Sequence, residues 1–130
     1  MDLFCIKNGK NRTEIHVLNG DDNFKSFLLQ DETALDKFKN EFEFKIGNFD
    51  NRKPDIYCIK KNNTKSNSTE IHILKGNDNY KSFVLHSITA LHETDDNWTY
   101  DVGKYNNNGK FNIYCIHKNK TTEIQIIRWK

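Results

Sequence analysis

The chain repeats one phrase of its own sequence. The phrase reads TEIHVLNGDDNFKSFLLQDETAL at residues 13–35 and TEIHILKGNDNYKSFVLHSITAL at residues 69–91, and it begins again as TEIQIIRWK at residues 122–130. Self-similarity of this kind is typical of chains in which one supersecondary unit stacks on the next. We therefore expect a repeat fold, in which equivalent residues of the three units have equivalent structural roles.

Each unit predicts four short strands. The third strand, at 14–18, 70–74 and 123–127, alternates apolar and polar residues, which is the period-two pattern of a strand. The second strand carries the cysteines (3–7, 56–60, 113–117), the first is aromatic (42–46, 98–102), and the fourth spans 24–29 and 80–85. Gly, Asn and Asp at 19–23 and 75–79 suit tight turns. Segments 33–42 and 89–98 are predicted loops, because only the first shows helical spacing.

Four strands recurring about every 50–57 residues are typical of an all-β fold with β-propeller-type blades. A parallel solenoid is the competing architecture, but its repeats are shorter. Residues 1–130 then form a single repeat domain of about two and a half blades: a partial blade at 1–35, a full blade at 42–91 and a partial blade at 98–130. A closed propeller takes about four to eight blades, so we expect homo-oligomerisation, as a dimer or trimer, to close a ring.

The order of motifs resembles the FG-GAP or VCBS-type repeats, whose propeller blades are related to those of integrin α-subunits. The resemblance covers nearly the whole chain and rests on FEFKIGNF at 42–49, WTYDVGKY at 98–105, the loop that follows each, and the IYCIK strand. In that family the loop often holds calcium. Here NFDNRKPD keeps only Asp50 and Asp55, and KYNNNGKFN has no carboxylate. Calcium needs several charged oxygens, so we expect lost calcium binding and no cofactor.

Charge and hydropathy argue against two classes of partner. The chain has 20 basic and 18 acidic residues, intermixed, and so lacks the basic face of a nucleic-acid binder. No stretch approaches the roughly 18 apolar residues of a membrane helix, so no membrane insertion is expected. MDLFCIK does not resemble a signal peptide, which predicts a cytoplasmic protein or one released by another route.

The cysteines and histidines favour structural roles. Cys5, Cys58 and Cys115 occupy equivalent positions in neighbouring units, too far apart for disulfides, and are predicted to be free thiols. His16 and His72 are also equivalent, and a glutamine replaces them in the third unit. We therefore expect a hydrogen-bonding role for both histidines. No nucleophile, base and orienting group are visible together, so the chain is not predicted to be an enzyme.

The stretch around the first tryptophan is the candidate ligand site. Carbohydrate sites combine an aromatic face with a few placed polar groups, and the predicted ligand-binding residues are Tyr80, His92, Glu93, Asp95, Asn97, Trp98 and Tyr100. The competing interpretation is that the aromatics pack between blades. The resulting prediction is a lectin-like module that binds glycans at repeated sites between blades, made multivalent by oligomerisation. The alternatives are a protein–protein interaction or adhesion scaffold, and a propeller fragment without its own ligand.

Overall fold

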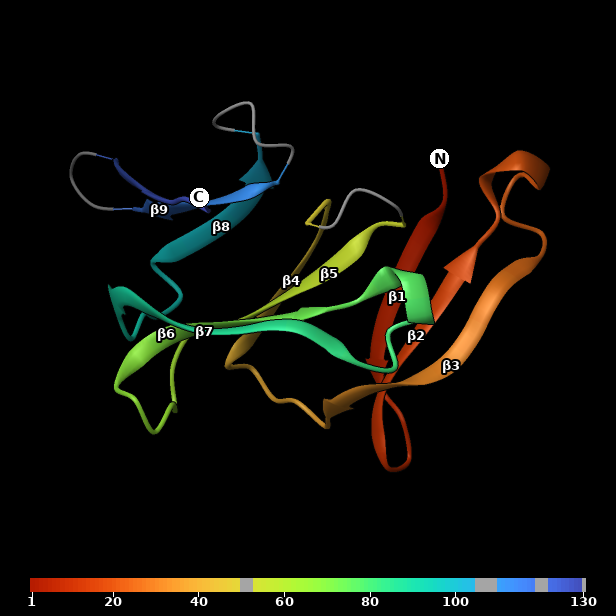
Figure 1. Ribbon diagram of the computed structural model, residues 1–130, viewed down its shortest axis with the longest axis horizontal. Coiled ribbons are helices and arrows are strands. Elements are labelled where there is room, and N and C mark those ends of the chain that lie inside the picture. Colours follow the sequence, from red (N-terminus) through yellow and green to blue (C-terminus); the bar gives the residue numbers. More distant parts are fainter. Residues whose placement is uncertain (50–52, 105–109, 119–121, 130) are drawn as a thin grey trace.

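Three antiparallel sheets make up the molecule in this computed structural model, which describes residues 1–49, 53–104, 110–118 and 122–129 (Figure 1). The first sheet contains β1 (Leu3–Asn8), β2 (Arg12–Leu18) and β3 (Phe27–Asp36). The middle sheet contains β4 (Phe42–Gly47), β5 (Asp55–Lys60), β6 (Ser68–Leu74) and β7 (Phe83–His92). The third sheet contains β8 (Trp98–Gly103), β9 (Asn112–His117) and β10 (Glu123–Ile127). The all-β prediction is confirmed.

Every pair of neighbouring strands follows chain order, so each sheet is a simple meander. Register repeats between sheets: Cys58 of β5 lies opposite Phe44 and His72, as Cys115 of β9 lies opposite Tyr100 and Gln125. The alternation predicted from the sequence sets the two faces of β2 and β6, since every second residue is buried. Among the described residues, no helix has the length and apolar character that crossing a lipid bilayer requires.

The turn before the fourth strand is longer than the sequence indicated. Short 3₁₀ turns, η1 (Gly20–Asp22) and η2 (Gly76–Asp78), are each followed by two residues with positive φ. The second of these is Phe24 (φ 66°) or Tyr80 (φ 67°), whose amide donates back to the carbonyl five residues earlier. The prediction that strands begin at these two residues is wrong, because left-handed backbone cannot continue a β-ladder; β3 and β7 begin at Phe27 and Phe83.

The predicted loops at 33–42 and 89–98 are also wrong in their first four residues, which extend β3 and β7. Thr33 and Thr89 are buried, and their hydroxyls donate to the carbonyl oxygens of Thr13 (2.9 Å) and Thr69 (2.7 Å) on the neighbouring strand. Each hydroxyl oxygen also accepts the amide two residues further on, at 3.1 Å. These bonds replace the ladder where a bulge interrupts the register.

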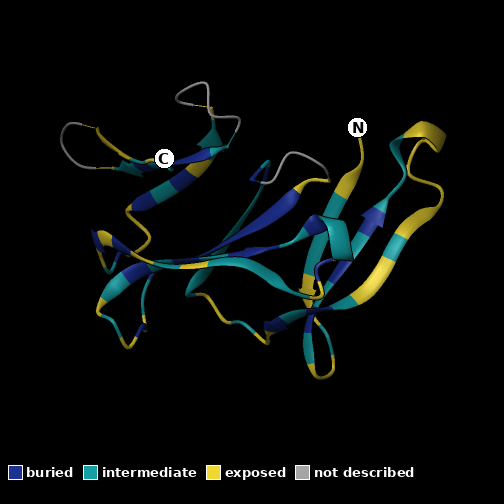
Figure 2. Cartoon of the chain, viewed as in Figure 1, coloured by how far each residue is buried: buried dark blue, intermediate teal, exposed yellow. Residues whose placement is uncertain are grey.

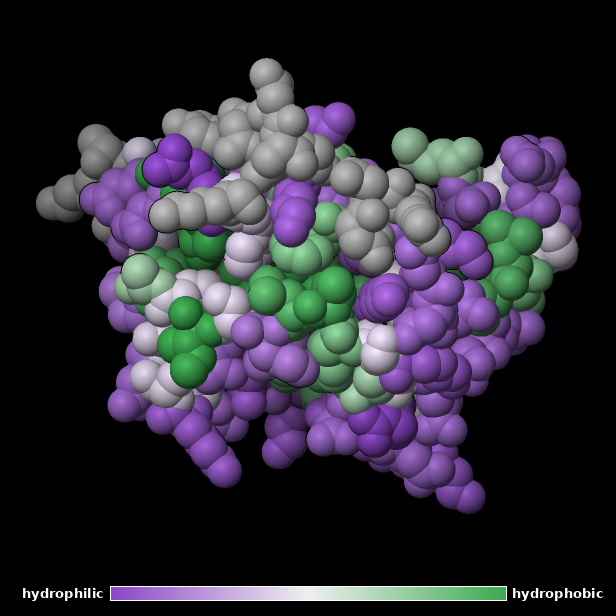
Figure 3. Space-filling model, viewed as in Figure 1, coloured by the Kyte–Doolittle hydropathy of each residue, from purple (hydrophilic) through white to green (hydrophobic). Residues whose placement is uncertain are grey.

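The middle sheet lies between the other two, and an apolar layer fills each junction (Figures 1 and 2). Ile15 and Val17 of the first sheet pack against one face of the middle sheet, which contributes Ile56, Cys58 and Leu74. The opposite face of the middle sheet packs against the third sheet through buried residues including Tyr57, Ile59, Ile71, Ile73, Trp98, Tyr100 and Ile113. Figure 3 shows further apolar side chains gathered over the middle sheet on the face in view.

Candidate functional site

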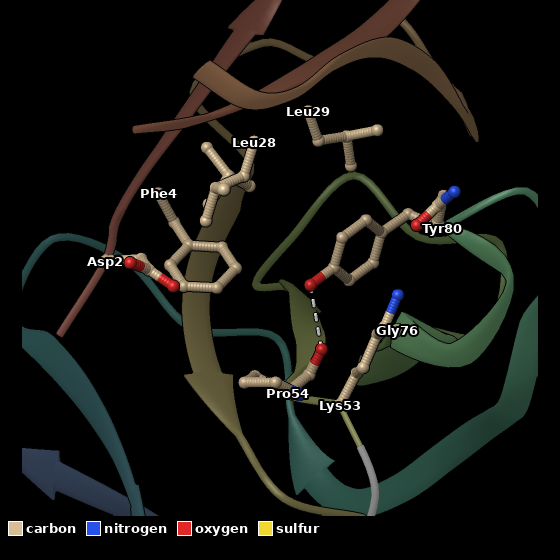
Figure 4. Close-up of a pocket in the computed structure, with 10 residues that line it drawn as sticks. Asp2, Phe4, Leu28, Leu29, Lys53, Pro54, Gly76 and Tyr80 are labelled. Atoms are coloured by element: carbon tan, nitrogen blue, oxygen red, sulfur yellow. Dashed lines mark hydrogen bonds between the residues drawn. The ribbon is translucent and has the colours of Figure 1, made fainter. Parts of the chain in front are cut away.

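A cavity of about 230 Å³ opens at the junction between the first and middle sheets (Figure 4). Its lining is mainly apolar, with a few polar groups: Asp2, Phe4, Val17, Leu28, Leu29, Lys53, Pro54, Gly76, Asn79 and Tyr80. The close-up shows Tyr80 and Phe4 projecting from opposite sides, from the middle and first sheets. The cavity therefore belongs to the contact between two units and to neither unit alone.

The η2 turn positions Tyr80 in this cavity. Its left-handed backbone directs the ring towards the segment before β5, and its hydroxyl donates to the carbonyl oxygen of Pro54 at 2.8 Å. Burial, together with the nearby Asp55 carboxylate, raises the pKa of Tyr80 to about 12. The phenol therefore stays neutral at physiological pH and acts as a fixed hydrogen-bond donor to the Pro54 side of the cavity.

Asp55 holds the wall behind the cavity. Its side chain is fully buried, and its two oxygens accept the amides of Gly76 (2.9 Å) and Phe49 (3.0 Å). A side chain at position 76 would meet the Pro54 carbonyl oxygen, 2.2 Å from a Cβ placed there. The same bond recurs in the other sheets, where Asp2 accepts the Gly20 amide at 3.0 Å and Asn112 accepts that of residue 129 at 2.9 Å. The aspartate is thus part of the repeat's framework.

The second junction is closed at the equivalent place by Trp129. Its indole Nε1 donates to the carbonyl oxygen of Phe111 at 2.9 Å, the counterpart of the Tyr80 bond to Pro54. The indole also packs edge-on against Phe49, with ring centroids 5.4 Å apart. Trp129 occupies the glycine position of its sister copies, so at this junction one aromatic donor replaces another that comes from a different position in the repeat.

Trp98 and Tyr100 are buried in the core between the middle and third sheets, 5% and 2% exposed. Trp98 stacks on His117 with centroids 4.4 Å apart, and His92 meets its edge at 5.8 Å. The Tyr100 hydroxyl hydrogen-bonds to that of Thr94. In the chain as described, neither ring offers an open face to a ligand.

The predicted polar residues around Trp98 serve mostly as turn and loop contacts. Glu93 accepts the backbone amide of Thr64 at 2.9 Å, and Asp95 accepts that of Asn97 at 2.9 Å. His92, Asp95 and Asn97 are exposed at the rim of this junction. Tyr80 lies at the other junction, so the seven predicted residues do not converge on one site.

The cavity at the first junction was missed because its lining is made of residues that look like core in the sequence. Phe4, Leu28 and Leu29 carry no polar signature, and they meet Tyr80 only after two units have packed. The one signal in the sequence was its single proline, Pro54, which directly precedes β5.

The described residues include no group of three or more His, Cys, Asp or Glu side chains arranged to hold a metal ion. Of the predicted degenerate calcium loops, residues 50–52 and 105–109 lie outside the described part of the chain. Comparison with family models, curated proteins and solved structures gives no match to this chain.

Proposed function

We propose that the chain is a multivalent carbohydrate-binding module, in which propeller-type blades from several copies close a ring and the ligand binds where two blades meet. The observation that carries the proposal is the cavity at the first junction. It combines aromatic rings (Tyr80, Phe4) with polar groups at Asp2, Lys53 and Asn79. An apolar ring face with a few placed hydrogen-bonding groups matches the two-sided chemistry of a sugar.

Two uncovered sheet faces support ring closure. On the third sheet, Ile124 is 63% exposed, whereas its equivalents Ile15 and Ile71 are fully buried in the two internal junctions. Ile126 is 37% exposed, whereas its equivalents Val17 and Ile73 are buried there. These two isoleucines form an apolar patch on β10 that no described segment of the chain covers fully. Fully burying an exposed isoleucine contributes about 1.5–3 kcal/mol, and these two partly exposed side chains would each contribute a part of that.

The first sheet has the complementary open face. Leu3 and Phe27 are 48% and 51% exposed, and they correspond to Ile56 and Phe83, which pack against the first sheet within the chain. The occupant that fits both faces is a second copy of this chain, because joining third sheet to first sheet repeats a contact the chain already makes twice. Such head-to-tail contacts close into a ring when the rotation allows.

Glycan binding can be tested with the cavity's exposed wall. Leu28→Ser removes apolar surface that is 56% exposed and lines the cavity; Ile88→Ser is a matched control, 67% exposed and outside its lining. On a glycan array, wild type and Ile88→Ser are expected to give a signal that a simple sugar displaces. Leu28→Ser should lose most of it. Equal signals from all three proteins would place any sugar elsewhere, at the Trp98 rim first.

A protein-binding scaffold is the second candidate, favoured by the largely apolar lining of the same cavity. Phe4, Val17 and Leu29 could accept an aliphatic side chain of a peptide. Absence of any glycan signal from a correctly folded oligomer would favour this alternative over the lectin.

A further inference from the structure

Two imidazoles face one another on adjacent strands of the middle sheet. His72 of β6 lies directly opposite His86 of β7, and their Nδ1 atoms are 2.7 Å apart. At this distance the two nitrogens share a hydrogen bond, so one carries the proton and the other supplies a lone pair. The Nδ1 atoms of the two imidazoles therefore face the same small space between the rings.

A carboxylate fixes the tautomer of His72. Its Nε2 lies 3.2 Å from Glu70 Oε1, and the other oxygen of Glu70 accepts the Ser66 hydroxyl at 2.6 Å. Nε2 therefore carries a proton and donates it, which leaves the Nδ1 lone pair directed at His86. A carboxylate behind an imidazole is the usual arrangement around metal-binding histidines, because it orients the ring and raises its basicity.

The pair lines a cavity of about 440 Å³ between the first and middle sheets. The charged groups around it are mixed: acids at Asp36, Glu41 and Glu70, and lysines at positions 37 and 60. Burial lowers the pKa of His72, and the neighbouring His86 and Lys60 lower it further against the opposing effect of Glu70.

We propose that His72 and His86 bind one divalent transition-metal ion of the zinc class through their Nδ1 atoms. Nitrogens about 2.0–2.1 Å from a tetrahedral ion lie roughly 3.3 Å apart, so the pair must open by about 0.6 Å. His86 is exposed and can turn. Its proton then resides on Nε2, and water from the cavity completes the coordination. Imidazole ligands suit Zn²⁺, Ni²⁺ and Cu²⁺.

The first sheet contains the same site with one ligand missing. His16 lies 3.1 Å from Glu14 and meets Phe27 edge-on at 6.0 Å, as His72 meets Phe83 at 6.2 Å. The residue opposite His16 is Gln30, whose amide is a poor metal ligand. The third unit has Gln125 in place of the first histidine. Among the sheets as described, only the middle one therefore pairs two imidazoles.

Titration of the full chain with ZnCl₂ at pH 7.5, followed by calorimetry, tests the site. Wild type is expected to bind one Zn²⁺ per chain. His86→Gln, which copies the first sheet and should fold normally, is expected to bind at least tenfold more weakly. His92→Gln, which changes a histidine outside the cavity, should match wild type. Unchanged affinity in His86→Gln would overturn the proposal and would point to the thiol of Cys5 or another donor.

The reciprocal variant tests whether the cross-strand pair is sufficient. Gln30→His places a second imidazole opposite His16, so the stoichiometry is expected to rise from one Zn²⁺ per chain to two. The double variant His86→Gln with Gln30→His should return to one. A stoichiometry that stays at one in Gln30→His would show that the pairing does not create a site, and the assignment of His72 and His86 would fall with it.

Discussion

At the scale of single residues, Asp55 joins the segments on both sides of β5. Asp55→Ala should lower the free energy of unfolding by about 2–3 kcal/mol, because it leaves the buried amides of Gly76 and Phe49 without an acceptor. Asp55→Asn should cost less, since Asn112 makes the same bond with its side-chain oxygen in the third sheet. Urea unfolding measures both. Equal losses in the two variants would contradict the argument.

The three thiols should differ in reactivity although they are equivalent in sequence. Burial raises the pKa of Cys115 to about 12 and that of Cys58 further, so at pH 8 almost no thiolate is present at either. Cys5 is only half-buried. Mass spectrometry after brief iodoacetamide treatment of the single chain, at concentrations too low for ring assembly, is expected to show one modified residue, Cys5, and three after denaturation. Early modification of Cys115 would mean that the third sheet opens readily.

The sequence predicted the environment of individual histidines better than their pairing. His16 and His72 were expected to form hydrogen bonds, and each bonds to the glutamate two residues before it. His86, on the neighbouring strand, is exposed. Its contact with His72 depends on the register between β6 and β7, which a bulge shifts. Register across a bulge is a tertiary property that residue spacing does not encode.

At the scale of elements, the paired threonines determine how far β3 and β7 extend. Thr89→Val should lower stability by about 1–2 kcal/mol, because the Thr69 carbonyl and Leu91 amide lose their partner. Thr99→Val, at a half-buried position on β8, is the control for exchanging a hydroxyl for a methyl group. Amide exchange at residues 89–92 should accelerate in Thr89→Val alone. Acceleration along all of β7 would instead indicate a loss of core packing.

Strand positions were readable because apolar alternation and the turn residues repeat in each unit, and the β2, β6 and β10 segments lie where they were expected. The residues at which the strands begin and end could not be predicted in the same way. Phe24 and Tyr80 belong to turns despite their aromatic side chains, since left-handed backbone at these positions closes a hydrogen bond to the residue five earlier. Local propensity favours strand there, and the turn geometry overrides it.

At the scale of the whole molecule, sheet order followed from the repeat, whereas the candidate site did not. Repetition predicts that like units stack, and so that the aromatics of one strand meet the next sheet. It does not predict where the two junctions differ. Trp129 fills the second junction at the place where Tyr80 leaves a cavity at the first, and a separate cavity of about 300 Å³ lies elsewhere in the second junction, beside Ile46, Gly47 and Phe111. Sites between units depend on the departures from the repeat.

The proposed ring can be tested by blocking one open face at a time. Ile126→Glu places a charge on the third sheet, and Phe27→Glu places one on the first, at side chains 37% and 51% exposed in the single chain. A buried unpaired carboxylate would oppose association by several kcal/mol. Light scattering is expected to give two or three times 15.4 kDa for wild type and for the exposed control Ile88→Glu, and 15.4 kDa for each face variant.

Mixing the two face variants distinguishes head-to-tail contact from a symmetric one. Ile126→Glu retains an intact first sheet and Phe27→Glu an intact third sheet, so one unblocked junction can form between them. The mixture should therefore contain 1:1 pairs and nothing larger, at protein concentrations where each variant alone is monomeric. If each face paired with its own copy, both variants would remain dimeric alone and mixing would change nothing. A wild-type chain that stays at 15.4 kDa at high concentration would remove the ring altogether.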